Sequence, residues 1–124
     1  MPAFMDDLDE IDIGDFVEDG DNGSKVLQLE YPFSVTVKEG GNTQTETVKY
    51  LEFRRPLGRD MDKIEQMAGS AMKGARSFVA GLVIVPVGIN ANKLGDLDAA
   101  DMMRAMKVCF DFFPKGRSGN TGAS

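Results

Sequence analysis

The side chains that most enzymes use for acid–base and nucleophilic chemistry are scarce in this sequence. The 124 residues contain no histidine, the commonest general base and metal-binding side chain, and a single cysteine, Cys109. A thiol without a histidine beside it lacks the base that activates it in cysteine hydrolases. The composition therefore predicts a protein that is not an enzyme and that uses no cofactor.

Three aspartates lie close together in the sequence and could be taken for cation ligands. They are Asp96, Asp98 and Asp101, but the glycine and the terminal glutamate of an EF-hand loop are absent. Asp98 and Asp101 also stand where a helix should begin, and helix capping explains both without a metal ion. We expect no metal site in this chain.

Basic and glycine-containing segments offer little for phosphate or nucleic-acid binding. Residues 69–74 contain glycine and lysine, but not in the order of a phosphate-binding loop. Arg54, Arg55 and Arg59 form a small basic cluster, which indicates solvated charges at a sheet end or a contact for the acidic N-terminus. An acidic chain without aromatic residues among its basic ones is a poor nucleic-acid binder.

Charge divides the chain into unequal parts. The length and the 42% of hydrophobic residues fit one domain, with a formal net charge of −6. Residues 1–24 carry nine of the 20 acidic residues and no basic one, and they end in a glycine-rich segment. We expect a flexible acidic arm outside the core, removable without loss of stability, or able to dock on a basic and apolar partner.

Signals for export or membrane insertion are absent from this sequence. The N-terminus lacks the basic and apolar regions of a signal peptide, and one cysteine cannot form an intrachain disulfide. The longest apolar run, residues 78–89, is too short to span a membrane and contains two glycines and a proline. These features predict a cytoplasmic protein without a membrane partner.

Alternation with a period of two predicts antiparallel strands from Lys25 onward. Leu27, Leu29 and Tyr31 share one face, Pro32 requires an edge or a break, and alternation resumes at Phe33. Glycines 40 and 41 supply a turn, and β-forming residues follow as far as residue 53. We expect a hairpin or a three-stranded meander. The apolar phase shifts between residues 50 and 51, which indicates a bulge or a strand covered on both faces.

Helical spacing replaces strand spacing after residues 55–58. Asp60 is the expected N-cap of a first helix, and Asp98 of a third helix over residues 99–113. A second, short helix should precede Pro86, residues 90–93 should form a loop, and residues 115–124 a flexible tail. The predicted apolar stripes are Met61, Ile64, Met67, Ala68 and Ala71 in the first helix, Phe78, Val79, Leu82 and Val83 in the second, and Met102, Met106, Cys109, Phe110 and Phe113 in the third. The fold class is α+β, with about three helices after the strands.

The order of these segments resembles a known family, the tail assembly chaperones of tailed bacteriophages. The resemblance covers about residues 25–114. It rests on Val26-Leu27-Gln28-Leu29 before Tyr31-Pro32, on Tyr50-Leu51-Glu52-Phe53-Arg54-Arg55-Pro56, on Asp60-Met61, and on Leu97-Asp98-Ala99-Ala100-Asp101 leading to Phe112-Phe113-Pro114. The acidic arm and the run Val83-Ile84-Val85-Pro86-Val87 depart from the family pattern.

The resemblance implies a non-catalytic protein of the infected host cell cytoplasm. Such a protein would bind and shield the tape measure protein during tail assembly, with tail tube subunits and a homo-oligomer as further possible partners. Because methionine suits adaptable apolar contacts, we expect binding through the third helix and the run 78–89. The candidate partner-binding residues are Leu82, Ile84, Val85, Met103, Met106, Phe110 and Phe112.

Two other function classes remain open at the level of the sequence. One is a structural tail or neck component of the virion, which would also be small and free of catalytic residues. The other is a nucleic-acid-binding regulator whose acidic arm imitates DNA and blocks its own site. Detection in purified virions would favour the first, and salt-dependent DNA binding after removal of residues 1–24 would favour the second.

Overall fold

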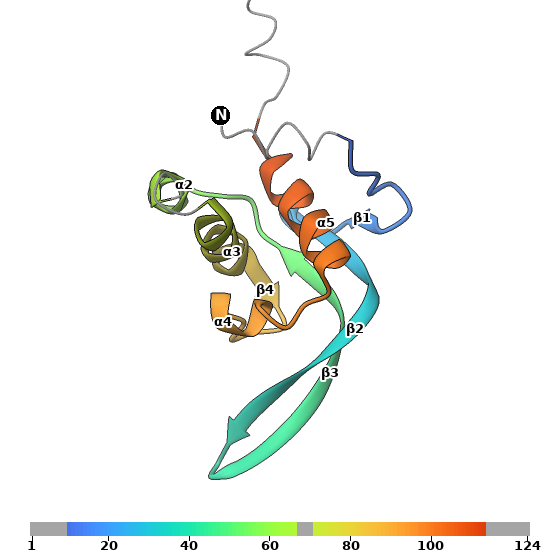
Figure 1. Cartoon of the computed structure of the whole chain (residues 1–124), viewed down its shortest axis with the longest axis vertical. Helices are drawn as coiled ribbons and strands as arrows, with labels where there is room; N and C mark the ends of the chain where they lie inside the picture. The colour runs from blue at the N-terminus through green and yellow to red at the C-terminus, as the bar shows by residue number, and fades with distance from the viewer. Residues whose placement is uncertain (1–9, 67–70, 114–124) are drawn as a thin grey trace, which may run out of the picture.

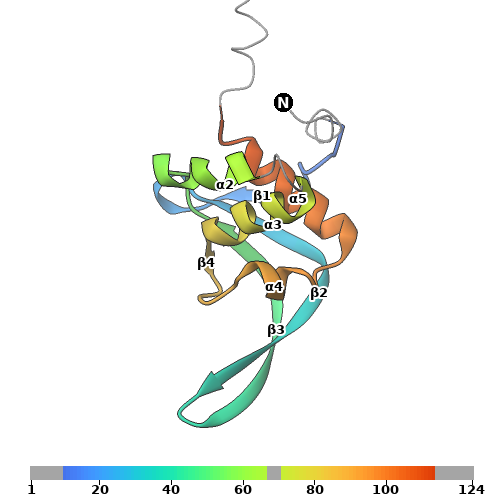
Figure 2. The same ribbon diagram turned by 60° about the vertical axis from the view of Figure 1, so that its left-hand side comes forward.

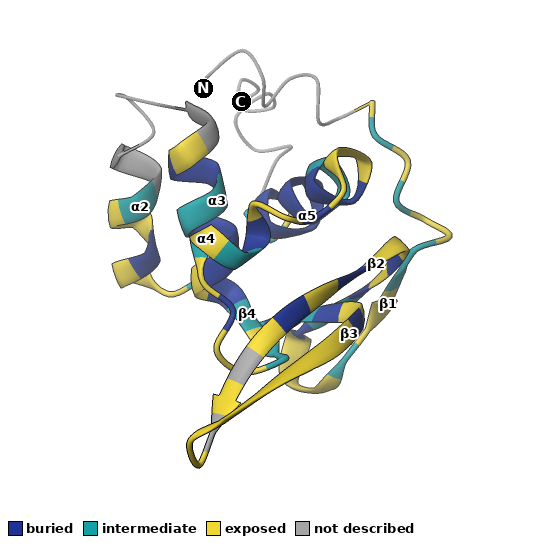
Figure 3. Cartoon of the chain, turned by 60° about the horizontal axis from the view of Figure 1, so that its bottom comes forward, coloured by how far each residue is buried: buried dark blue, intermediate teal, exposed yellow. Residues whose placement is uncertain are grey.

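Four antiparallel strands form one sheet in the order β1-β2-β3-β4, and the helices gather on one side of it (Figures 1 and 3). This computed structural model describes residues 10–66 and 71–113. The α+β class and the antiparallel N-terminal strands predicted from the sequence are confirmed, with a fourth strand in addition. The expected tail over residues 115–124, and Met67 and Ala68 of the first helical stripe, lie outside the described residues.

The central element is a long hairpin made of β2 (Lys25–Glu39) and β3 (Asn42–Phe53). Glu39 pairs with Asn42, so only two residues form the turn. Gly40 and Gly41 both have positive φ, 57° and 85°, as a type I′ turn requires. The predicted hairpin is therefore confirmed, together with the reason for its two glycines.

An irregularity interrupts this hairpin where the sequence changes phase. Gln28 pairs with Tyr50 but Phe33 pairs with Val48, so four residues of β2 lie opposite one residue of β3. Pro32 lies in this bulge, where its missing N–H removes no ladder hydrogen bond. Of the two interpretations of the phase shift, the bulge is the one observed. Tyr31 is 53% exposed and does not share the buried face of the preceding leucines.

The N-terminal segment differs from the arm expected over residues 1–24, within the part that is described. Strand β1 (Val17–Asp19) pairs with the start of β2, with Val17 opposite Leu27. The predicted linker over residues 20–24 is instead a tight connection that contains the 3-10 turn η1 (Asp21–Gly23). Four apolar side chains of this segment pack partly against the core, which explains the docking: Ile11, Ile13, Phe16 and Val17.

A glycine permits the close approach of β1 to the sheet. The Ser24 hydroxyl is buried and donates to the Glu52 carboxylate at 2.6 Å. A Cβ atom at Gly20 would lie 2.3 Å from the Ser24 Oγ and 2.8 Å from a Glu52 carboxylate oxygen. Residue 20 must therefore lack a side chain for the connection between β1 and β2 to close over this hydrogen bond.

Helical structure follows the sheet, as the change in spacing predicts. The 3-10 turn η2 (Gly58–Asp60) leads into α2 (Met61–Gln66), and α3 (Ala71–Leu82) follows. Strand β4 (Val83–Val85) corrects the prediction that Val83 continues the second helix. Valine is β-branched, and Val83 pairs with Phe53 at the edge of the sheet, so sheet pairing determines the conformation here.

The last two helices show how far capping residues predict helix starts. Residues 90–93, expected to form a loop, include the start of α4 (Ala91–Leu94), whose N-cap Asn90 accepts from the Lys93 amide at 2.8 Å. Helix α5 (Ala99–Phe110) begins at Asp98 as predicted, because the Asp98 side chain accepts from the Ala100 amide at 2.9 Å. It ends at residue 110, three residues earlier than expected.

The C-terminal half of helix α5 is part of the core. All six residues from Ala105 to Phe110 are buried, so no side of this part of the helix faces solvent (Figure 3). A helix covered on every side is a core element. Phe78 of α3 stacks on Phe110 with ring centroids 5.0 Å apart and lies 5.9 Å from the ring of Phe113.

Candidate interaction surface

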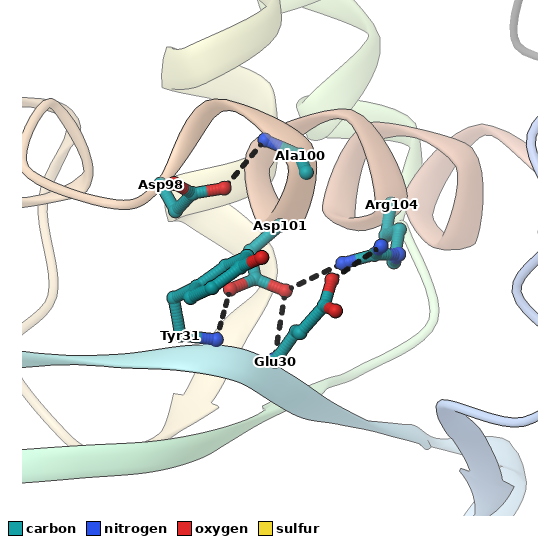
Figure 4. A network of polar contacts seen from close by, with 6 residues as sticks. All are labelled: Glu30, Tyr31, Asp98, Ala100, Asp101 and Arg104. Carbon is teal, nitrogen blue, oxygen red and sulfur yellow. Dashed lines mark hydrogen bonds and ion pairs between the residues drawn. The ribbon is translucent and has the colours of Figure 1, made fainter.

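A buried carboxylate fixes α5 to the bulge of β2. The Asp101 side chain is fully buried, and its two oxygens accept the backbone N–H groups of Glu30 and Tyr31 at 2.9 and 2.8 Å (Figure 4). The bulge frees these two N–H groups from the β ladder, and the carboxylate satisfies them. The sequence reading of Asp101 as a helix cap is therefore incomplete: Asp98 caps the helix, whereas Asp101 joins it to the sheet.

An arginine completes this network and connects it to the N-terminal segment. Arg104 donates to Asp101 at 2.9 Å and to Glu30 at 2.8 Å (Figure 4). Its guanidinium carbon also lies 4.1 Å from the ring centroid of Phe16, within the range of a cation–π contact. The Asp101 oxygens are thus occupied by hydrogen bonds from Arg104 and from the backbone of β2. The network therefore holds α5, β2 and the N-terminal segment together.

A second arginine–aspartate pair joins the end of β3 to the helices. Arg54 donates to both oxygens of Asp60, at 2.8 and 3.0 Å, and to the Gly81 carbonyl at 3.0 Å. Asp60 also accepts the Leu57 amide at 2.6 Å. The hydrogen bonds from Arg54 are the main reason that the pKa of Asp60 lies below its usual value, against the opposing effect of burial. Arg54 therefore has a structural partner within the chain.

The thiol of the single cysteine is inaccessible in this structure. The Cys109 side chain is completely buried in α5, and burial raises the pKa of its thiol well above the usual value. A buried thiol of this kind is a poor nucleophile. Within residues 10–66 and 71–113, no three aspartate, glutamate or cysteine side chains come together in a group that could hold a metal ion.

Three of the seven predicted partner-binding residues are part of the core. Leu82 and Met106 are fully buried, and Phe110 is 7% exposed, so none presents a surface to a partner in this structure. The prediction treated α5 and the end of α3 as amphipathic helices with one free apolar face. The N-terminal segment, the sheet and the other helices cover these faces, which a periodicity argument does not reveal.

The other four predicted residues are accessible to different degrees. Ile84 on the edge strand is 40% exposed, whereas Val85, Met103 and Phe112 are half-buried. Met103 and Phe112 pack partly against the core, and the guanidinium of Arg55 lies 5.7 Å from the ring centroid of Phe112. Of the seven predicted residues, Ile84 is therefore the one that is exposed.

Val87, which was not among the predicted residues, is the most exposed large apolar side chain in the described chain. It is 91% exposed, between Pro86 and Gly88, and Gly88 has a φ of 88°. A turn with proline and glycine was the signal that could have placed residue 87 at the surface. Residues 84–87, which we name the β4 apolar segment, thus run from the edge strand into the turn that follows it, with Ile84 and Val87 exposed.

A second exposed feature is the distal part of the hairpin, which extends beyond the helices in two views (Figures 1 and 2). All six residues from Asn42 to Thr47 are exposed. Apart from Glu46, their side chains are uncharged and polar. We name residues 34–47 the projecting hairpin. Its sequence predicted a turn, but not that the strands would extend past the core.

Comparisons with known proteins give no further assignment. No protein-family model, no characterised protein and no solved structure matches this chain. Among the described residues, no helix has the length and apolar character needed to cross a membrane.

Proposed function

We propose that the protein is a non-catalytic tail assembly chaperone of a tailed bacteriophage, which binds and shields the tape measure protein before the tail tube encloses it. The observation that carries the proposal is the β4 apolar segment, in which Ile84 and Val87 are exposed at the edge of the sheet. Exposed apolar side chains at one place mark a surface for contact with another apolar surface. The resemblance of residues 25–114 to these chaperones supplies the partner.

The rest of the molecule supports a binding role. Its two buried aspartates, Asp60 and Asp101, are paired with arginines and with backbone N–H groups, so these carboxylates stabilise the fold. A small domain with an exposed apolar turn can cover the apolar face of a long helix and release it, because such contacts need no covalent chemistry. Shielding of this kind requires a rigid domain and an accessible apolar surface.

The proposal is tested by co-expression with the tape measure protein encoded in the same genome. The double variant Ile84→Asp/Val87→Asp places two charges in the β4 apolar segment, and both positions are exposed, so the fold should be retained. We expect the wild type to keep the tape measure protein soluble and to co-purify with it. The double variant should lose both effects.

A control variant separates this surface from exposed apolar residues in general. Leu57 is 48% exposed in the connection before α2, away from the β4 apolar segment in sequence, so Leu57→Asp should leave co-purification unchanged. The proposal is wrong if the double variant folds, as judged by circular dichroism, and still keeps the tape measure protein soluble.

A structural component of the virion tail or neck is a second candidate, favoured by the projecting hairpin. Long polar hairpins that extend from a domain can add a strand to a neighbouring sheet, as structural subunits do. The two candidates differ in where the protein is found after assembly. A chaperone is absent from purified virions, whereas a structural component is present in a fixed ratio to the other tail proteins.

A further inference from the structure

The projecting hairpin has an open backbone edge along β3. On the β2 side, β1 covers only residues 25–27, and on the β3 side, β4 pairs only with Glu52 and Phe53. Residues 43–47 of β3 therefore have no strand beside them on the side away from β2, within the described part of the chain. An open edge of this length is a template for pairing with another strand.

The turn geometry shows which backbone groups this edge presents. In a hairpin with a two-residue turn, the flanking pair Glu39 and Asn42 is hydrogen-bonded, and alternate pairs follow from it. The pairs that contain Thr43, Thr45 and Thr47 are then the ones without hydrogen bonds between the two strands. Their N–H and C=O groups point outward, so three donors and three acceptors line the open edge.

We propose that a second copy of this chain pairs with this edge, antiparallel and in register about Thr45, to give a symmetric dimer. The two hairpins then form one four-stranded ribbon with β3 and β3 of the second copy at its centre. Such an interface is isologous, since the same edge serves both copies. This inference does not depend on the proposed function.

The side chains of residues 43–47 are complementary to themselves in this register. Thr43 lies opposite Thr47 of the second copy, and Thr45 lies opposite its own counterpart on the symmetry axis. Threonine pairs across strands are favourable. Gln44 lies opposite Glu46 of the second copy, so an amide N–H can donate to a carboxylate and no like charges meet.

Within residues 43–47, other registers are less favourable. The outward-facing residues are odd-numbered, so the register can move only in steps that keep odd residues opposite each other. Moving the axis to Glu46 places two carboxylates directly opposite, which is destabilising. Moving it to Gln44 places Glu46 opposite Asn42 at the turn and shortens the pairing. Among registers confined to residues 43–47, the one about Thr45 gives the longest pairing without a charge conflict.

The opposite edge of the hairpin, on β2, is protected in a way that the β3 edge is not. Lys38 stands among its outward-facing residues, and Pro32 lies at its inner end. Lysine and proline are the residues by which natural sheets discourage pairing at an edge. Residues 43–47 contain neither, which favours pairing through β3. A strand of this length gives a small interface, so the dimer should be concentration-dependent.

A disulfide trap tests the register. In hydrogen-bonded antiparallel pairs the Cα atoms are about 5.5 Å apart, a separation that a disulfide bridges. In Thr45→Cys the new thiols meet on the symmetry axis, whereas in Thr36→Cys, the cross-strand neighbour on the protected edge, they do not. Cys109 is fully buried and does not compete. In a glutathione buffer we expect Thr45→Cys to form a covalent dimer several-fold faster than Thr36→Cys.

A second pair of variants tests the edge without new thiols. Proline at position 45 removes an outward N–H of β3, and proline at position 36 removes one of β2 in the same cross-strand pair. Sedimentation over a range of concentrations should show dimers for the wild type and Thr36→Pro, but only monomer for Thr45→Pro. Equal disulfide rates at positions 45 and 36, or a wild type that stays monomeric at every concentration, would overturn the proposal.

Discussion

Asp101 shows how one carboxylate can hold together segments that are 70 residues apart. Its oxygens accept two N–H groups that the bulge of β2 leaves without ladder partners, and Arg104 balances its charge. The bulge therefore depends on the aspartate: without this acceptor, two partly buried N–H groups would lose their partner, at up to about 1–3 kcal/mol each. This dependence makes residue 101 the most sensitive polar position that we identify.

The variant Asp101→Asn should lower the free energy of unfolding by about 3 kcal/mol. Asparagine has one acceptor oxygen, and its amide would direct N–H groups toward the backbone N–H groups of the bulge. Chemical denaturation measures the change. Asp98→Asn on the same helix is the control, since asparagine caps a helix about as well as aspartate. Equal stabilities of the two variants would contradict the assigned role of Asp101.

Asp60 predicts a pH dependence with a definite sign. Its pKa in the folded state is lowered by Arg54, so its ionised form contributes stability above the pKa of the unfolded state, about 3.9. That contribution is lost as the pH falls through the lowered folded-state pKa. Urea unfolding should therefore show a large stability gap between the wild type and Asp60→Asn at pH 6, and a smaller one at pH 3. A gap that widens on acidification would disprove this assignment.

At the scale of elements, β1 turns the acidic N-terminal segment into part of the fold. Truncation of residues 1–19 removes the strand and the ring of Phe16 that stacks on Arg104. We expect the free energy of unfolding to fall by about 2 kcal/mol or more, from lost apolar contact and the lost cation–π interaction. Denaturation of both forms measures it. Phe16→Ala should show part of the loss and Asp15→Ala, at an exposed neighbour, almost none.

The turn of the projecting hairpin gives an element-scale prediction at two glycines. Apart from the adjacent residues of the chain, no atoms lie within 4 Å of a Cβ placed at Gly40 or Gly41, so only the positive φ angles restrict these positions. Gly41→Ala should destabilise the hairpin by about 1–2 kcal/mol, whereas Gly40→Asn creates a favourable Asn-Gly turn.

Amide hydrogen exchange at low protein concentration measures this effect within the hairpin. The Gln44 and Glu46 amides face β2 and should exchange faster in Gly41→Ala, but not in Gly40→Asn. The Thr45 amide faces outward and is an internal control, because it should exchange rapidly in all three proteins. Unchanged protection at Gln44 and Glu46 in Gly41→Ala would contradict the turn assignment.

The sequence predicted correctly those elements that depend on neighbouring residues. The hairpin turn at Gly40 and the N-cap at Asp98 depend on residues next to one another, and both are confirmed. Strands β1 and β4 are only three residues long, and their pairing with distant residues determines them. The local sequence instead predicts a flexible acidic arm at β1 and the continuation of a helix at β4.

At the scale of the molecule, packing between elements buries part of the predicted partner-binding surface. Periodicity identified Met106 and Phe110 as apolar, but it could not show that other elements enclose residues 105–110 of α5 on all sides. Ile84, predicted to bind a partner, is exposed, because a three-residue edge strand has little to cover it. Val87 is exposed because it lies in the turn between Pro86 and Gly88. In the sequence this turn lies within a run of apolar residues, which by itself indicates burial.

The burial of α5 makes Cys109 a reporter for the whole molecule. It is the single cysteine of the chain, completely buried in the central helix, and its thiol pKa is raised by that burial. A thiol reagent can therefore react only after the helices and the sheet separate. We expect labelling in native buffer to be slow and to follow the equilibrium population of the unfolded state.

The same measurement connects the scales when it is repeated on the variants. If opening exposes Cys109 only through global unfolding, Asp101→Asn should increase the labelling rate about a hundredfold, the factor that corresponds to about 3 kcal/mol. Asp98→Asn should label at the wild-type rate. Ile84→Asp/Val87→Asp should do so too, because its changes lie at the surface. Fast labelling of the wild type would show instead that α5 opens locally, and that the N-terminal segment does not hold the core closed.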